Sequence, residues 1–80
     1  MAANLRNLNL SGANFSGANL TKANLMKSNL SYTNLSDAIL TDANLTETSL
    51  VRANLTNANL SNVDLSHADL RGAIMHDVVK

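Results

Sequence analysis

The sequence contains no cysteine and no proline, and only three glycines, one tyrosine and one phenylalanine among its 80 residues. Without cysteine there is no disulfide framework, no thiolate metal site and no cysteine nucleophile. The absence of proline is typical of a chain whose backbone N–H groups are nearly all needed for pairing between strands. Two aromatic side chains, Phe15 and Tyr32, are too few for a stacking platform or a large ligand pocket.

An excess of charge of one sign is also lacking, because six lysines and arginines balance six aspartates and glutamates. Nucleic acids and anionic membranes attract basic faces, so this balance argues against both as partners. No apolar run is long enough to span a bilayer, and the chain opens with Met-Ala-Ala-Asn, without the basic and apolar stretches of a signal peptide. We therefore expect a soluble, cytoplasmic protein that forms one domain over residues 1–80.

What the sequence does contain is a large apolar residue at every fifth position, without a break in phase. A step of five turns a side chain by about 140° around an α-helix, and it places successive side chains on opposite faces of a strand. Only a chain that turns a corner within every repeat directs all of them to one place. The period therefore predicts a solenoid with a structural core of Leu5, Leu10, Phe15, Leu20, Leu25, Leu30, Leu35, Leu40, Leu45, Leu50, Leu55, Leu60, Leu65, Leu70 and Met75.

The corners are predicted at the two residues that follow each core residue. Gly12, Gly17 and Gly72 all occupy the second of these positions, which we call the turn tip, and asparagine or aspartate occupies six others. These residue types accept the positive φ that the third position of a type II turn requires. The remaining tips break this preference, so we expect turns of a different type at Lys22, Lys27, Tyr32, Glu47, Arg52 and His67.

These repeats resemble the pentapeptide-repeat family, whose consensus is A(D/N)LXX. Matching quintets include Ala13-Asn14-Phe15-Ser16-Gly17 and Ala68-Asp69-Leu70-Arg71-Gly72, and the resemblance extends over nearly the whole chain. It implies an all-β fold, a right-handed quadrilateral β-helix (a pentapeptide-repeat solenoid) of about four coils stacked at ~4.8 Å, with four repeats per coil. On this interpretation the repeats occupy about residues 3–77, and residues 78–80 form a short C-terminal tail.

A coil of twenty residues also predicts which outward side chains stack in columns. The asparagines that precede most core residues would lie above one another, with their amides bonded from coil to coil. Columns of opposite charge would favour stacking, although exposed pairs contribute only about 0–1 kcal/mol each. At the turn tips we expect Lys22 to stack with Asp42, Lys27 with Glu47 and then His67, and Tyr32 with Arg52. The last of these pairs would form a cation–π contact.

A catalytic or metal site is not expected. His67 and His76, with Asp64, Asp69 and Asp77 nearby, would fall at different corners, so no rigid set of three ligands converges. Catalysis also needs a concave site that excludes water, whereas the interior of this solenoid would be filled with leucine. We therefore expect no enzyme activity, no catalytic residue, no metal, no cofactor and no small-molecule substrate.

The function that fits these features is a non-enzymatic structural scaffold or protein–protein interaction module, with another protein as its partner. The resemblance implies an alternative, because some members of the family mimic double-stranded DNA and bind type II topoisomerases such as gyrase. Mimicry of that kind needs rows of like carboxylates in place of phosphates. The few acids of this chain share columns with lysines, so the alternative fits less well.

The two ends of such a solenoid would expose backbone groups and invite association from edge to edge. The C-terminal end is unusually apolar because it contains Ile74, Val78 and Val79. Three interpretations stay open. Val78 and Val79 fold over the last coil as a minimal cap, or these residues form a subunit interface in an end-to-end homodimer, or the chain is a piece of a longer protein.

Overall fold

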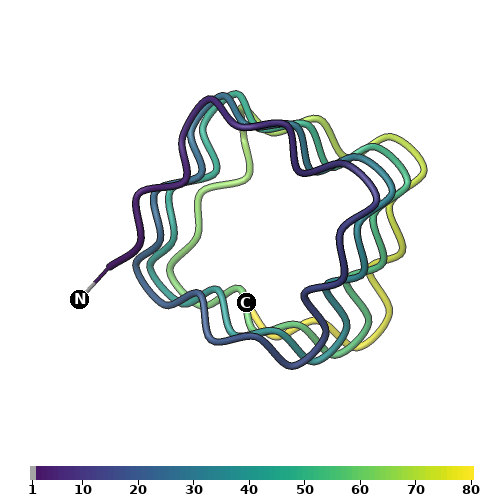
Figure 1. Ribbon diagram of the computed structural model, residues 1–80. Coiled ribbons are helices and arrows are strands. Elements are labelled where there is room, and N and C mark those ends of the chain that lie inside the picture. The colour runs from purple at the N-terminus through teal and green to yellow at the C-terminus, as the bar shows by residue number, and fades with distance from the viewer. Residues whose placement is uncertain (1) are drawn as a thin grey trace.

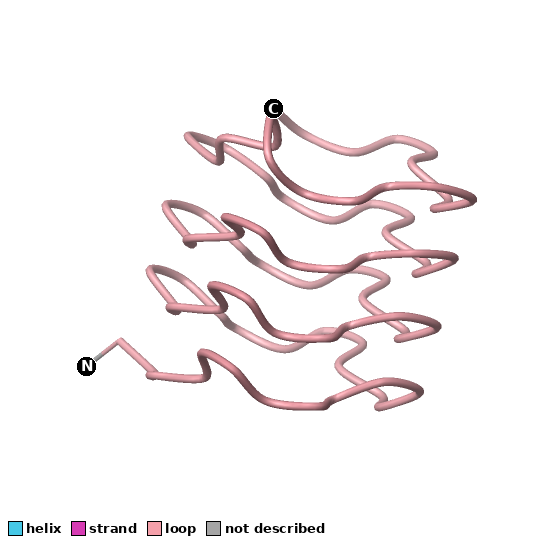
Figure 2. Cartoon of the chain, turned by 90° about the horizontal axis from the view of Figure 1, so that it is seen from above, coloured by secondary structure: helices cyan, strands magenta, loops and turns pink. Residues whose placement is uncertain are grey.

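The computed structural model describes residues 2–80, so Met1 of the expected domain lies outside the described residues. The chain winds as a four-sided solenoid whose coils lie above one another (Figure 1). In the same view the path runs clockwise as it recedes from the viewer, which makes the winding right-handed. The N-terminus lies at one end of the stack and the C-terminus at the other (Figure 2).

Every repeat has the same local structure, a short extended side followed by a two-residue turn. Most turns close with a hydrogen bond from the N–H of the residue after the turn to the carbonyl of the core residue before it, whereas Leu8 N–H donates to Ser28 Oγ. Ala13 N–H donates to Leu10 O at 3.1 Å, and Ala18 N–H donates to Phe15 O at 2.9 Å. Within residues 2–80 no segment is a helix or a continuous strand, because each side contributes a single bridging residue to the pairing between coils.

We name the four sides A, B, C and D after the core residue that each carries first: Leu5, Leu10, Phe15 and Leu20. Coils pair through parallel bridges between residues twenty positions apart, such as Asn19↔Ile39, Ile39↔Asn59 and Asn59↔Val79 on side D. Three backbone hydrogen bonds recur at each regular step. On side C, between the first two coils, they run from Phe15 N–H to Asn34 O (2.7 Å), from Gly17 N–H to Ser36 O (2.9 Å) and from Asn34 N–H to Ala13 O (3.0 Å).

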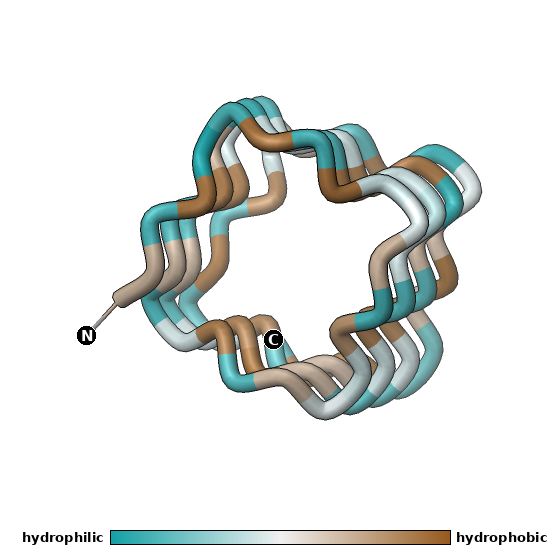
Figure 3. Tube along the Cα trace, in the orientation of Figure 1, coloured by the Kyte–Doolittle hydropathy of each residue, from teal (hydrophilic) through white to brown (hydrophobic). Residues whose placement is uncertain are grey.

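All fifteen core residues belong to the buried core or pack against it. Those of the two middle coils, from Leu25 to Leu60, are at most 2% exposed. Those of the first coil and of the last coil, Phe15 and Met75 among them, are only partly buried because no further coil covers them. Hydrophobic residues recur at the same place in coil after coil (Figure 3). Each leucine that is fully buried contributes roughly 1.5–3 kcal/mol to folding, so stability depends on contact with neighbouring coils.

Hydroxyl groups take the place of alanine at three buried positions beside the core. Thr33 Oγ1 donates to Leu30 O at 2.7 Å, and Thr48 Oγ1 donates to Leu25 O at 2.7 Å. The Ser28 hydroxyl donates to Leu5 O and accepts a hydrogen bond from Leu8 N–H. Across residues 2–80 no buried side-chain nitrogen or oxygen lacks a partner, so these polar groups are tolerated in an otherwise apolar interior.

The turns correct one prediction. Lys22, Lys27, Tyr32, Glu47 and Arg52 all have positive φ, between 55° and 61°, as the asparagine and aspartate tips do, so the prediction of a different turn type was wrong at these five positions. A left-handed conformation costs an ordinary residue about 1–2 kcal/mol. The closing hydrogen bond and the bonds to adjacent coils offset this cost, because they hold the backbone regardless of the side chain. At His67, the sixth of these tips, φ is not positive.

Side A departs from the regular pairing in the last coil. Glu47 N–H donates to His67 O at 3.0 Å, one residue further along the chain than in the preceding coils, and Asp64 forms no bridge to Asn44. In Figure 1 the light-green segment of this coil lies inside the outline of the coils before it. Val63 occupies the position beside the core where this side otherwise carries alanine. The extra residue gives the segment the character of a β-bulge, which bends an edge and interrupts pairing.

The C-terminal residues continue the solenoid. Val79 bridges to Asn59, Leu60 N–H donates to Val79 O at 2.6 Å, and Val78 packs against the core. Val78 and Val79 therefore follow the path of the coil and do not fold over it as a cap. The regular repeat also extends to Val79, beyond the boundary at residue 77 that we expected.

Candidate interaction surfaces

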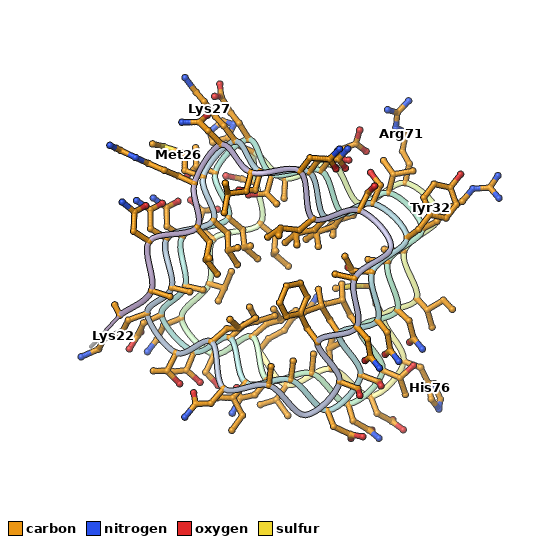
Figure 4. The ribbon with its side chains drawn as sticks, viewed as in Figure 1. Lys22, Met26, Lys27, Tyr32, Arg71 and His76 are labelled. Atoms are coloured by element: carbon orange, nitrogen blue, oxygen red, sulfur yellow. The ribbon has the colours of Figure 1, made fainter. Side chains whose placement is uncertain are left out.

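The charged side chains in the described part of this protein lie on its outer surface. The interior is packed with the core residues, and the side chains of Lys22, Lys27, Tyr32, Arg71 and His76 point away from it (Figure 4). Two sets of outward positions repeat along the solenoid. One is the column of residues before each core residue, mostly asparagine, and the other is the turn tip at each corner.

The asparagine columns stabilise the turns. Ser16 N–H donates to Asn14 Oδ1 at 3.0 Å, and the same bond recurs at 3.0–3.1 Å for Ser31 N–H with Asn29 and for Thr56 N–H with Asn54. Each amide oxygen is thus occupied two residues along its own chain, as in an Asx-turn. The prediction that these amides bond to one another from coil to coil was wrong. Met26 N–H forms the same bond with Asn24 Oδ1 at 3.1 Å, so the sequence signal for the local bond was the asparagine itself and not the type of residue that follows the core residue.

Two aspartates take over this role in the last coil. Asp64 Oδ1 accepts a hydrogen bond from Ser66 N–H at 2.9 Å, and hydrogen bonds from the Ser66 side chain and backbone lower the pKa of the Asp64 carboxyl. Asp69 accepts hydrogen bonds from Arg71 Nε and NH2 at 2.7–3.2 Å. These bonds and the charge of Arg71 lower the pKa of Asp69, and the same side-chain bonds and the charge of Asp69 raise the pKa of Arg71. Both carboxylates are therefore structural acceptors.

The turn tips carry the exposed charges. Lys27 Nζ lies 3.8 Å from Glu47 Oε2, which confirms the pair predicted from the column, although both side chains are more than half exposed and such a pair adds at most about 1 kcal/mol. Among residues 2–80 no ion pair joins Lys22 to Asp42. A Cβ added at Gly72 would lie 3.0 Å from Arg52 Cγ, so the stem of Arg52 lies against the next coil. Its cation–π contact with Tyr32 stays a prediction.

Five large apolar side chains are exposed. Tyr32 is the most exposed at 62%, Ile74 and Val79 follow at 50% each, and the other two are Leu8 and Ile39. The three residues expected at an interface therefore do not all face the same way. Ile74 and Val79 face outward on sides C and D near the C-terminal edge, whereas Val78 faces the core.

The imidazole and carboxylate groups do not gather. His76 Nε2 lies 3.2 Å from Asp77 Oδ2, but residues 2–80 contain no group of three or more histidines, aspartates and glutamates placed to hold a metal ion. A hollow open to solvent is lined by Ala2, Asn19, Thr21 and Lys22. Its side chains include no pair of acid and base that could act on a substrate.

Comparison with known proteins agrees with this architecture. A family model described as pentapeptide repeats matches residues 3–42 and again 38–77. The chain belongs to the pentapeptide repeat family. The resemblance carried by the A(D/N)LXX quintets is thereby confirmed. Members of this family form right-handed quadrilateral β-helices and are generally non-enzymatic.

Solved structures of pentapeptide repeat proteins superpose on most of this chain. A protein of the Arabidopsis thaliana thylakoid lumen is 34% identical over 92% of this chain, with a TM-score of 0.67. HetL of Nostoc sp. strain PCC 7120, involved in heterocyst differentiation regulation, is 30% identical over 89% of this chain, with a TM-score of 0.51. The protein alr5209 of the same Nostoc strain is 27% identical over 90% of this chain, with a TM-score of 0.56.

This pentapeptide repeat chain spans only 48% of the length of the Arabidopsis structure, 38% of HetL and 64% of alr5209. Among curated proteins, no sequence matches it. A membrane-crossing helix of sufficient length and apolarity does not occur in residues 2–80.

Proposed function

We propose that this pentapeptide repeat protein is a cytoplasmic scaffold or protein-interaction module, built as a solenoid of almost four coils, and that its partner is another protein. The observation that carries the proposal is the filled interior. Leucines such as Leu35, Leu40 and Leu50 are fully buried at the centre of the tube. An enzyme needs a concave site that excludes water, so the surface that remains for function is the outside.

The corner between sides B and C is the best contact point for a partner on this outer surface. It carries Tyr32, the most exposed large apolar residue, with Arg52 at the tip of the next coil and Val51 beside it. Tyrosine and arginine are enriched at the centres of protein interfaces, because each buries a large area and still forms hydrogen bonds. HetL, which is involved in heterocyst differentiation regulation, supports a regulatory rather than a catalytic role.

The rival function is mimicry of DNA toward a type II topoisomerase. The arrangement of the acids disfavours it, because Glu47 pairs with Lys27, Asp69 pairs with Arg71, and Asp77 contacts His76. A phosphate backbone is a row of unpaired negative charges. A supercoiling assay with purified gyrase separates the two functions: we expect no inhibition and no protection from quinolones at micromolar protein.

The proposal is tested by affinity capture followed by binding with the purified partner. The full chain is immobilised and incubated with an extract of its native host, and the retained protein is purified and titrated by calorimetry. We expect Tyr32→Ser to weaken binding at least tenfold, and Asn57→Ser, at an exposed tip of another corner, to leave it unchanged. Equal affinity for the wild type and both variants would refute the assignment of this corner, and inhibition of gyrase would replace the proposal with its rival.

A further inference from the structure

The two edges of the solenoid expose complementary sets of backbone groups. Sides B and C show this most clearly, because their pairing is regular throughout. At the N-terminal edge of each, one N–H and two C=O groups have no backbone partner among residues 2–80. These groups belong to Asn9 (N–H and C=O) and Ser11 (C=O) on side B, and to Asn14 (N–H and C=O) and Ser16 (C=O) on side C.

The C-terminal edge presents the opposite set. Each of sides B and C exposes two N–H groups and one C=O without a backbone partner in the described part of the chain. The donors are the N–H groups of Leu70 and Gly72 on side B and of Met75 and Asp77 on side C, and the acceptors are the C=O groups of Ala68 and Ala73.

This difference follows from the parallel pairing of the coils. At every regular step the earlier coil donates two N–H groups and accepts one, and the later coil does the reverse, as Phe15, Gly17 and Asn34 do within the chain. Two edges of opposite kind can therefore form three hydrogen bonds per side and leave no group unpaired. Two N-terminal edges together hold two N–H and four C=O groups per side, and two C-terminal edges hold four N–H and two C=O groups. Two edges of the same kind can therefore form only two hydrogen bonds per side.

We propose that copies of this chain stack head to tail, with the N-terminal edge of one copy on the C-terminal edge of the next. The core supports this geometry, because Leu10 and Phe15 at one edge and Leu70 and Met75 at the other are only partly buried. Stacking covers these side chains as the middle coils cover theirs. A two-fold symmetric dimer would also bury apolar surface, but it would leave N–H or C=O groups buried without partners, which is costly.

The distribution of charge also favours contact between an N-terminal and a C-terminal edge. Residues 2–20 carry one charged side chain, Arg6, whereas residues 61–80 carry three aspartates against one arginine and one lysine. Head-to-tail stacking therefore brings a basic coil to an acidic one. Two C-terminal edges would instead bring together two acidic coils.

The bulged segment of side A limits the contact. Asp64 lies off the ladder there and the segment lies inside the outline of the other coils (Figure 1), so the regular sides B and C carry the stacking. The contact is heterologous and does not close, so it generates open chains of subunits rather than a dimer. This inference goes beyond the proposed function and does not depend on it. Stacking leaves the corner of Tyr32 exposed in every subunit and multiplies the sites available to a partner.

Two measurements on the full 80-residue chain test the proposal. The first is sedimentation equilibrium as a function of protein concentration. We expect a weight-average mass that rises above the 8.5 kDa monomer and continues past the dimer without a plateau. A mass that stays at the monomer, or one that levels at the dimer, overturns the head-to-tail arrangement.

The second measurement uses the absence of cysteine. One preparation carries Ser16→Cys at the N-terminal edge, and four others each carry one cysteine at a corner of the C-terminal edge, replacing Ser61, Ser66, Arg71 or His76. Successive coils bring equivalent residues within disulfide range, so oxidised mixtures should cross-link Ser16→Cys to one of the four. Ser16→Cys linked only to itself, or no more cross-linking than with Thr41→Cys in a middle coil, refutes the proposal.

Discussion

Replacing Leu35 with asparagine tests whether the core residues stabilise the protein as a continuous ladder. Leu35 is fully buried on side C, between Phe15 in the coil before and Leu55 in the coil after. The change removes the burial of a leucine, roughly 1.5–3 kcal/mol, and it buries an amide without a partner, about 1–3 kcal/mol. The expected loss is therefore about 3–6 kcal/mol.

That loss is comparable with the whole stability of the chain. At about 0.05–0.15 kcal/mol per residue, a protein of this size has on the order of 4–12 kcal/mol of unfolding free energy. Since 1 kcal/mol shifts Tm by about 4–8 °C in a domain of this length, a drop of at least roughly 12 °C is expected. Circular dichroism melts and urea titrations measure both quantities.

Two variants calibrate the result. Asp37→Asn changes an exposed tip and should shift the unfolding free energy by less than about 0.5 kcal/mol. Leu5→Asn changes a partly buried core residue at the N-terminal edge and should fall between the two. If Leu35→Asn and Asp37→Asn melt within experimental error of each other, the core residues do not form a dry ladder and the reasoning fails.

Two further predictions concern the turn tips and the last coil. Lys22 has a φ of 61°, so Lys22→Gly should relieve left-handed strain and raise the unfolding free energy, measured by urea titration, by up to about 1 kcal/mol. His67 has no positive φ, so His67→Gly should lower the unfolding free energy by about 0.5–1 kcal/mol. A change of the same sign in both variants would contradict the turn assignment. For the last coil, hydrogen bonds hold the pKa values of Asp64 and Asp69 below their ordinary value of 3.8, so their stabilisation is present above pH 4 and is lost as the pH falls through the lowered pKa values. The Tm of the wild type should therefore fall more between pH 4 and pH 2 than the Tm of the double variant Asp64→Asn/Asp69→Asn. An equal fall in the wild type and the double variant would refute this cause. It would also be refuted if the Tm of the control Asp37→Asn fell as little as that of the double variant.

The inward phase could be predicted from the period of five, and the corners from the glycine, asparagine and aspartate residues at the turn tips. The charge pair of Lys27 with Glu47 also required the coil of four repeats, which the resemblance to the pentapeptide-repeat family implied. A period of five permits one kind of path, and a coil of four repeats places residues twenty apart side by side. The local use of the asparagine amides could not be predicted from stacking alone. Two acceptable bonds competed for the same oxygen of Asn14, and the shorter path to Ser16 N–H prevailed.

The irregular segment of side A could not be predicted because its cause is not in any one repeat. Val78 also replaces a small residue beside the core, and its side keeps the regular pairing to Asn59. Tyr32 and Arg52 also lack a turn preference, and they adopt positive φ. Side A has both Val63 and His67 in the last coil. The backbone of that coil is held by pairing to a neighbouring coil on one face only. Single-residue propensities do not sum to the behaviour of such an edge.

The turn tip is the position of the repeat whose side chain the fold constrains least, so we expect a partner to be recognised there. The other four positions of each quintet are used by the fold, as core, as spacer, as acceptor for the turn and as the first turn residue. The tip needs only a left-handed conformation, which glycine and asparagine adopt at least cost. Lys22, Tyr32 and Arg52 adopt it at a higher cost and, in residues 2–80, form no ion pair that would compensate for it. Strain that the fold does not require points to side chains retained for contact with another molecule, which is why Tyr32 is the position at which we test the proposed function.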